Sequence, residues 1–400
     1  MKSKVSLYAE KLVVGVLALS STITSVTVLL IVFFLFTEGA GLFTKAPVHG
    51  GQVVVVNAQN PVLHLSAEEV KDIFDQKITN WQQVGGQNAE IVRFRLSDIT
   101  TYVPEDSLGM NFEHLPQRLS QIFAQHPNLI GFFPEKYLQQ NAGIRKIELD
   151  KISVGGFLGG RDWYPTIEPA VQMGALPLIL GTLWVSLGAI LIALPLGLAT
   201  AIYLAEIANA RIRSFLKPVI ELLAGIPSVV FGFFGLVVIV RLIQDVFGLP
   251  VGETALAGSI ILGIMALPTI ISVSEDALRT TPRHMKEASL ALGATKWQTI
   301  YKVVVPYSVS GISTAAILGI GRAIGETMAV LMVTGNAAVI PNSFLEPVRT
   351  IPATIAAELG EAPTGGVHYE ALFALGCILF LMTLAINLIV NVVAPKRQVG

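Results

Sequence analysis

The chain has 400 residues, of which 52% are hydrophobic and only 14% are charged, and its mean hydropathy is +0.65. These values exclude an ordinary soluble protein, and the net charge of −1 leaves no basic excess that would indicate a nucleic-acid partner. The single cysteine, Cys377, excludes an internal disulfide.

Six apolar segments are each long enough to cross the roughly 30 Å of hydrocarbon in a bilayer. The first, Leu12–Phe36, carries no charged residue. Because further spans follow it, we expect a retained helix rather than a cleaved signal peptide. The sequence therefore predicts an all-α polytopic membrane protein, whose other five spans are Leu176–Leu204, Val219–Val240, Ala255–Val273, Tyr307–Val333 and Ala371–Val393.

Lysine and arginine gather in alternate connections between these spans. The connections at Gln244–Gly252 and Asn336–Glu370 are poor in basic residues, with Arg349 as the main exception. Because basic connections stay in the cytoplasm, we expect both termini there and residues 37–170 in the periplasm of a cell with an inner membrane. The basic residues on the cytoplasmic side are then Lys2, Lys4, Lys11, Arg211, Arg213, Lys217, Arg279, Arg283, Lys286, Lys296, Lys302, Lys396 and Arg397.

Residues 37–170 have the composition of a small, soluble α/β domain inserted between the first two spans. Ser66 and Glu69 form a capping box before a short helix with Val70, Ile73 and Phe74 on its buried face. A second helix is predicted at Pro116–Gln125, with Leu119, Ile122 and Phe123 facing inward. The predicted strands are Val53–Asn57, Ile91–Phe94, Leu129–Phe133 and Ile144–Leu149.

The chain thus divides into three parts. Residues 1–36 hold the cytoplasmic N-terminus and the first span, and residues 37–170 form the inserted domain. Residues 171–400 form a core of five spans with a cytoplasmic loop at 274–306.

The loop at 274–306 carries the most specific motif in the chain. Glu287, Ala288 and Ser289 are followed by Gly293 and, further on, by Val303, Val305 and Pro306. Gly293 permits a sharp bend between two helical pieces, and Pro306 suits the first turn of the next helix. The pattern resembles the EAA loop with which permeases of ATP-binding-cassette (ABC) importers contact their ATPase subunits, with Ser289 in place of an alanine. The alternative is an ordinary amphipathic loop helix.

The sequence has no Gly-x-x-x-x-Gly-Lys-Ser/Thr phosphate loop. We therefore expect partner ATPase subunits to bind ATP and Mg²⁺, and this chain to hold no cofactor. No nucleophile, base or metal cluster assembles from its motifs, and the six histidines lack ligand spacing. The chain is accordingly predicted not to be an enzyme in its own right.

Arg322 and Glu326 stand four residues apart in the fifth predicted span, so we expect them to share one helix face, where they can pair. Charges at such depth usually face an aqueous pathway or a partner. An arginine fork also matches a tetrahedral oxyanion. The alternative is an ion pair that only fixes helix packing.

Around this pair the resemblance becomes narrower. The run Gly319–Val330 and the run from Ala224 to Gly232 resemble PstC-type phosphate permeases, and the similarity extends from about Trp163 to the C-terminus. The resemblance implies a type I ABC permease fold and a role for Arg322 and Glu326 in phosphate movement. It also implies three partners: a second, related permease, a pair of ATPase subunits and a periplasmic phosphate-binding protein.

The inserted domain resembles part of a periplasmic phosphate-binding protein at Leu65–Gly86 and at Ile130–Phe133. Those proteins hold the anion in an Arg-x-Asp-Gly-Ser-Gly-Thr-like run, of which only Arg95 and Thr101 can be matched here. Both glycines are missing and Ile99 lies between, although a backbone nest needs residues that tolerate positive φ. We therefore expect a degenerate lobe that docks or regulates, with a spacer as the alternative.

Two alternatives to phosphate import stay open at this point. The cargo could be another oxyanion, such as phosphonate, sulfate or molybdate. The chain could also act as a membrane subunit that senses phosphate, although nothing in the sequence resembles a kinase or receiver domain.

Overall fold

A computed structural model describes residues 4–109, 112–138 and 143–393. The chain forms two compact units. The first comprises Met1–Ser153, Thr166–Val171 and Ala362–Cys377, and the second comprises Val154–Pro165, Gln172–Glu361 and Ile378–Gly400. Lys2, Lys396 and Arg397, which contribute to the predicted orientation, lie outside the described residues.

Six helical segments of the described chain are long and apolar enough to span a membrane, which confirms the predicted number. The first unit contains α1 (Lys4–Gly41), whose most apolar stretch is exposed along its whole length. Such a helix requires lipid or another apolar surface around it. The last span, α16 (Val367–Val393), begins in the first unit and continues into the second.

The lobe of the first unit is a four-stranded sheet in the order β3-β4-β1-β5. Strand β1 (Gln52–Asn57) runs antiparallel to β4 (Leu129–Pro134) and β5 (Ile144–Lys146), whereas β3 (Val92–Arg95) is parallel to β4. A short parallel pair joins β2 (His64–Leu65) to β6 (Glu148–Leu149). Three of the four predicted strands are therefore confirmed, whereas the fourth, Ile144–Leu149, is divided into β5 and β6, which lie in different sheets.

Helices cover both faces of this sheet, and β1 shows why the fold needs a continuous apolar strand. Val54 and Val56 pack with α2 (Ala67–Phe74), while Val53 and Val55 pack with α4 (Leu115–Gln125). The predicted capping box of α2 and the predicted buried faces of both helices are confirmed. Short helical turns complete the lobe: Leu42–Thr44, Trp81–Val84, Leu96–Asp98, α3 (Ile99–Tyr102), Glu105–Leu108 and Glu135–Tyr137.

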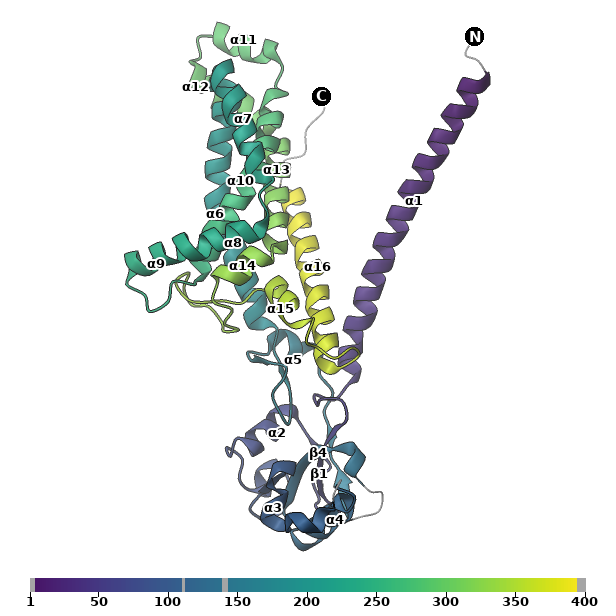
Figure 1. The fold of residues 1–400 in the computed structure, drawn as a ribbon. Coiled ribbons are helices and arrows are strands. Elements are labelled where there is room, and N and C mark those ends of the chain that lie inside the picture. The colour runs from purple at the N-terminus through teal and green to yellow at the C-terminus, as the bar shows by residue number, and fades with distance from the viewer. Residues whose placement is uncertain (1–3, 110–111, 139–142, 394–400) are drawn as a thin grey trace. The chain divides into compact units, whose positions relative to one another are not determined.

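In the second unit, α10 (Ala255–Arg279) packs along both α6 (Leu176–Ile202) and α13 (Val305–Gly325) (Figure 1). Glycines bring these helices together: a Cβ on Gly197 or Gly319 would lie 2.7–2.8 Å from the Ile270 side chain. Larger residues there would force the helices apart. Smaller elements of this unit are α5 (Val154–Gly159), β7 (Trp163–Tyr164), β8 (Gln172–Met173) and α15 (Ile351–Glu358).

The predicted bounds of the third span were wrong. The segment Val219–Val240 is not one helix, because α7 (Ala210–Ala224) ends before Gly225-Ile226-Pro227 and the spanning helix runs from Ser228 to Phe247. Proline lacks the amide that would continue the ladder and disfavours helical backbone at the residue before it. The new helix comprises α8 (Ser228–Phe234), a π turn and α9 (Val240–Phe247), and Figure 1 shows it crossing α6 and α10 steeply.

The fifth span also differs from the prediction of one helix at Tyr307–Val333. Its helical path begins earlier, with α12 (Lys296–Thr299) and the π turn Ile300–Val304, and continues through α13 to Gly325. Glu326 has extended backbone (ψ 132°), and a separate helix, α14 (Met328–Val333), follows. Apolar composition runs across the break, so hydropathy cannot locate it.

Candidate coupling loop and substrate pathway

The loop between the fourth and fifth spans folds into α11 (Arg283–Ala291) and α12, with a bend at Gly293. Gly293 has φ +85°, and an added Cβ would meet no atom within 4 Å. Glycine is therefore required by the backbone and not by lack of space. Thr295 then starts α12 through a capping box with Gln298. The bend predicted at Gly293 is confirmed.

One side of this bent pair is exposed and largely apolar. Glu287 and Ala288 of the motif are exposed on α11, and beyond them Leu292 is 90% exposed. Trp297 and Tyr301 continue the apolar surface, at 60% and 46% exposure. Apolar side chains gathered on an exposed loop are typical of a protein-contact site.

The opposite side of α11 bonds to the rest of the second unit. The Lys286 ammonium donates to Glu206 Oε1 at 2.5 Å, and the Ser289 and Thr299 hydroxyls share a hydrogen bond of 2.9 Å. Ser289 replaces the second alanine of the motif, so this departure adds a specific contact.

Pro306 is the second residue of α13, which agrees with the predicted first-turn position. The helical path is nevertheless continuous from α12, because the π turn Ile300–Val304 joins the two helices. A proline inside a regular helix removes one backbone hydrogen bond. Pro306 closely follows a π turn, where the regular α-helical hydrogen bonding is already interrupted.

Sequence reasoning missed a charged cluster on the same face of the second unit. Glu275 in α10 is 1% exposed and accepts from Arg213 at 2.7 Å, with Lys217 at 3.2 Å and Arg279 at 3.6 Å. Burial alone would lower the pKa of Lys217, but the hydrogen bond and charge of Glu275 outweigh it, so that pKa is raised. The one signal of this cluster in the sequence is the four-residue spacing of Glu275 and Arg279, which places them on the same face of a helix.

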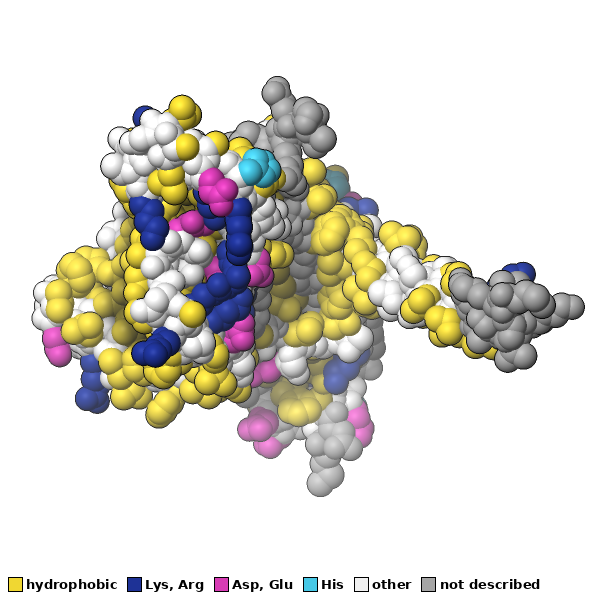
Figure 2. Space-filling view, turned by 90° about the horizontal axis from the view of Figure 1, so that it is seen from above, with side chains coloured by type: hydrophobic (Ala, Val, Ile, Leu, Met, Phe, Trp, Pro, Cys, Tyr) yellow, Lys and Arg dark blue, Asp and Glu magenta, His cyan; other side chains and the backbone are white. Residues whose placement is uncertain are grey.

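On the face drawn in Figure 2, Lys and Arg side chains form a row with carboxylates beside them. The cluster joins α7 to α10 and lies at the basic end of the spans. A buried carboxylate is costly to desolvate, so the three surrounding cations are what allows Glu275 to stay there.

Arg349, the basic exception in a connection otherwise poor in lysine and arginine, has a local counter-charge. Its guanidinium lies 2.8 Å from Glu358 of α15, and the indole N–H of Trp163 also donates to that carboxylate. Arg349 is thus neutralised within its own connection.

Arg322 lies in the last turn of α13 and is half-buried. The expectation that Arg322 and Glu326 share a helix face was wrong: the helix ends at Gly325, Glu326 leaves its face, and the described residues show no ion pair between the two. An arginine in the last turn also complements the negative end of the helix dipole, which is a structural reason for its presence.

The break after Arg322 lies beside the break in the third span. Helix α8 packs on α14, and a Cβ on Gly232 would lie 3.0 Å from the Ala329 Cα. Ile226, from the first break, packs against a core cluster that includes Ala323 and Ala329. Interrupted helices placed together in this way are a feature of transport pathways.

In the lobe, Arg95 and Thr101 are both exposed. The Arg95 amide donates to Asp98 Oδ2 at 3.0 Å, and the Arg95 guanidinium lies over the Phe74 ring. Ile99 is buried with φ −55°, in a run that forms a 3₁₀ turn followed by a helical turn. The backbone there forms helical turns and not a nest of amides around an empty centre.

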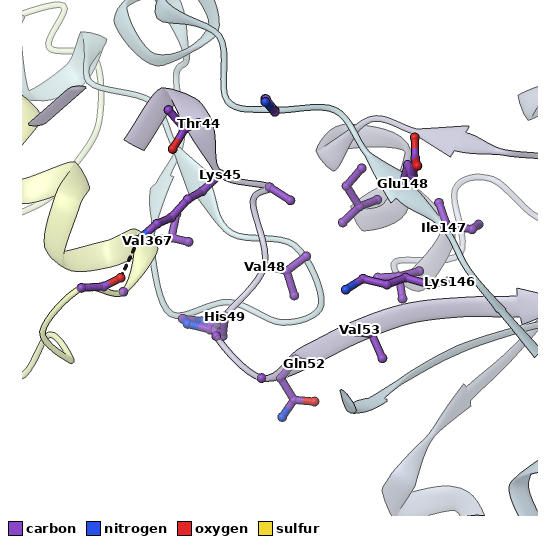
Figure 3. A pocket seen from close by; sticks show the side chains of 18 residues that line it. Thr44, Lys45, Val48, His49, Gln52, Val53, Lys146, Ile147, Glu148 and Val367 are labelled. Carbon is purple, nitrogen blue, oxygen red and sulfur yellow. Dashed lines mark hydrogen bonds between the residues drawn. The ribbon is translucent and has the colours of Figure 1, made fainter. Parts of the chain in front are cut away.

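A cavity of about 810 Å³ lies in the first unit, near the start of β1 (Figure 3). Lys45, Lys146 and Lys151 line it. Lys45 donates to Glu370 Oε1 and to the Gly365 carbonyl at 2.6 Å each, and Lys146 pairs with Glu135 at 2.9 Å. Carboxylates thus neutralise two of the three ammonium groups that line the cavity, which weakens it as a candidate anion site. The described residues contain no group of three or more metal-ligating side chains.

Two family patterns match the chain. The pattern described as "binding-protein-dependent transport system inner membrane component" matches residues 193–399, and the pattern described as "PBP superfamily domain" matches residues 35–140. The transport pattern begins at residue 193, inside the second span, and continues through the sixth span. The PBP pattern covers most of the lobe.

Curated relatives agree with the first pattern. The chain is 41% identical over 257 residues to the probable ABC transporter permease protein YqgH of Bacillus subtilis, which covers 64% of this chain and 83% of that protein. It is 40% identical over 249 residues to the phosphate transport system permease protein PstC of Mesorhizobium japonicum, covering 58% and 75%. A similar solved structure is the inward-facing MetNI methionine ABC transporter, 23% identical, with a TM-score of 0.40 and coverage of 56% and 95%.

Proposed function

Since the chain belongs to the family of binding-protein-dependent transport system inner membrane components, we propose that it is the permease subunit of an ABC importer for inorganic phosphate. It is a multi-pass protein of the inner membrane. The observation that carries the proposal is the bent loop, which presents an exposed apolar surface beside Glu287 and bonds to the membrane helices on its other side. Relatives that are named as phosphate permeases support the cargo.

The partners follow from what this chain lacks and from what its family requires. Two ATPase subunits would bind ATP and Mg²⁺ and dock on the loop through Leu292, Trp297 and their neighbours. A second, related permease would complete the pathway, and a periplasmic phosphate-binding protein would deliver the anion. In the orientation that the basic connections predict, both termini and the loop are cytoplasmic, and residues 37–170 are periplasmic.

Arg322 is the proposed anion contact. It stands at the end of α13, a helix of 21 residues that begins at the coupling loop and therefore extends about 30 Å from it. A displacement of the loop would be transmitted through α13 to the Arg322 guanidinium, whose planar fork suits a phosphate oxyanion. Glu326, now beyond the helix end, would face the same break without holding the arginine in place.

The lobe is proposed to dock or regulate, and not to capture phosphate. Its support is the run from Arg95 to Thr101, in which Asp98 already accepts from the Arg95 amide and Ile99 fills the core. A carboxylate in that position would repel an incoming anion. Sensing of phosphate and a passive spacer are the alternative roles of the lobe.

Uptake of radiolabelled phosphate by proteoliposomes that contain the assembled complex tests the proposal. We expect ATP-dependent uptake that excess unlabelled phosphate abolishes and that sulfate, molybdate and phosphonate do not. Competition by one of these oxyanions at equal concentration would assign the cargo to that anion instead.

The orientation has its own test. In a Cys377→Ser background, Thr295→Cys should react with an impermeant thiol reagent only after the cells are permeabilised. Labelling in intact cells would place the loop outside and would refute the coupling role altogether.

A further inference from the structure

The coupling loop is attached to two different membrane helices by side chains that the general motif does not specify, Lys286 before it and Ser289 in place of its second alanine. On α11, Lys286 reaches Glu206 in the π turn Tyr203–Ile207 that ends α6. Three residues further on, Ser289 reaches Thr299 at the end of α12, directly before the π turn that leads into α13. Spacings of three and four residues lie on one side of a helix, so both contacts come from the inward side of α11.

The side chains that form these contacts are largely buried. Lys286 and Glu206 are 24% and 12% exposed, and Thr299 is 5% exposed. A largely buried ammonium and carboxylate cannot separate without leaving an uncompensated charge, so the two ends should move together. Exposed pairs of the kind found elsewhere on the chain would separate at little cost.

Both contacts lie at π turns, where the regular α-helical hydrogen bonding is interrupted. In the first, the Ala208 amide bonds to the Tyr203 carbonyl, five residues back. Such turns often occur at functional sites and allow a local change of helix register. Helices α6 and α13 both pack along α10, so a force applied through both contacts acts on the packed core of the unit.

We propose that the Lys286–Glu206 ion pair and the Ser289–Thr299 hydrogen bond are the two joints that transmit displacement of the loop to α6 and α13. Lys286 and Ser289 are positioning residues in this scheme, because neither is expected to touch the ATPase or the transported anion. The inference rests on the proposed function and adds to it the route by which force enters the membrane helices.

Charge reversal in the full assembled complex tests the first joint, with phosphate uptake and ATP hydrolysis measured on the same proteoliposomes. Lys286→Glu and Glu206→Lys should each raise the ATP hydrolysed per phosphate at least tenfold, with the ATPase subunits still co-purifying. The double variant restores opposite charges and should return to within about threefold of the original ratio. Arg211→Glu is the matched control, since Arg211 is an exposed cytoplasmic-side base in α7, and its ratio should not change.

Unchanged ratios in both single variants would overturn the first joint, and so would a double variant no better than the worse single one. If Lys286→Glu fails to reach the membrane, Lys286→Met keeps the aliphatic stem without the charge and should show the same loss of coupling. For the second joint, Ser289→Ala and Thr299→Val should each raise the ratio about threefold, and combining them should add nothing further. Additive effects would show that the two hydroxyls act separately and would overturn that joint.

The cargo can be wrong while the joints are right. A complex that hydrolyses ATP but takes up no phosphate would count against the proposed function. The joints would then be judged by the stimulation of ATP hydrolysis by the periplasmic binding protein, which the single charge reversals should abolish and the double variant should restore.

Discussion

Replacing Gly293 tests the loop geometry most directly, because the structure isolates one physical term. With φ at +85° and no atom within 4 Å of an added Cβ, substitution costs only backbone energy. For alanine this conformation is unfavourable by about 1–2 kcal/mol, which corresponds to a factor of about 5–30 in the population of the bent loop. Asparagine tolerates the left-handed region better and should lose less.

The assay is the affinity of the ATPase subunits for the permease, measured by titration in detergent, with uptake as a second readout. We expect Gly293→Ala to weaken binding about 5- to 30-fold and Gly293→Asn to lie between alanine and the original chain. Gly155→Ala is the matched control, since its Cβ also meets nothing and its φ is not positive. If alanine binds as tightly as glycine, or if asparagine is worse than alanine, the reasoning from backbone conformation fails.

Three further predictions concern other parts of the chain. Arg322→Gln should abolish phosphate uptake while the ATPase subunits still co-purify, and normal uptake would remove Arg322 from the pathway. Glu275→Gln should destabilise the protein by about 3 kcal/mol, the low end for breaking a buried pair because its partners are 24–47% exposed, and should lower the midpoint of thermal unfolding. Asp276→Asn, at a carboxylate that is 71% exposed, is its control and should hardly shift that midpoint. Arg95→Ala should leave uptake and its concentration dependence unchanged, and a raised half-saturation for phosphate would show that the lobe binds the anion after all.

Local patterns in the sequence were sufficient for much of the architecture. Strand β1 and helices α2 and α4 follow from runs of valine, a capping box and apolar spacing, all of which act over fewer than a dozen residues. The number of spans likewise follows from hydropathy, since a bilayer imposes a minimum apolar length. The bend at Gly293 was also foreseen, because few other residues adopt its backbone conformation.

Hydropathy failed where apolar composition continued through a change of backbone. Gly225-Ile226-Pro227 and the Glu326–Thr327 link both interrupt helices inside apolar stretches, so the predicted third and fifth spans ran across them. The expectation that Arg322 and Glu326 share a helix face failed for the same reason, because the four-residue rule holds only while the helix continues.

By itself, the sequence determined which segments are apolar, which are basic and where a glycine must bend the loop, since each depends on neighbouring residues alone. Tertiary structure decided which charges meet: Glu275 with Arg213, 62 residues away, and Lys286 with Glu206, 80 residues away. The residue types at these positions suit many partners. Only the packing of α6, α7, α10 and the loop brings each carboxylate within bonding distance of its particular bases.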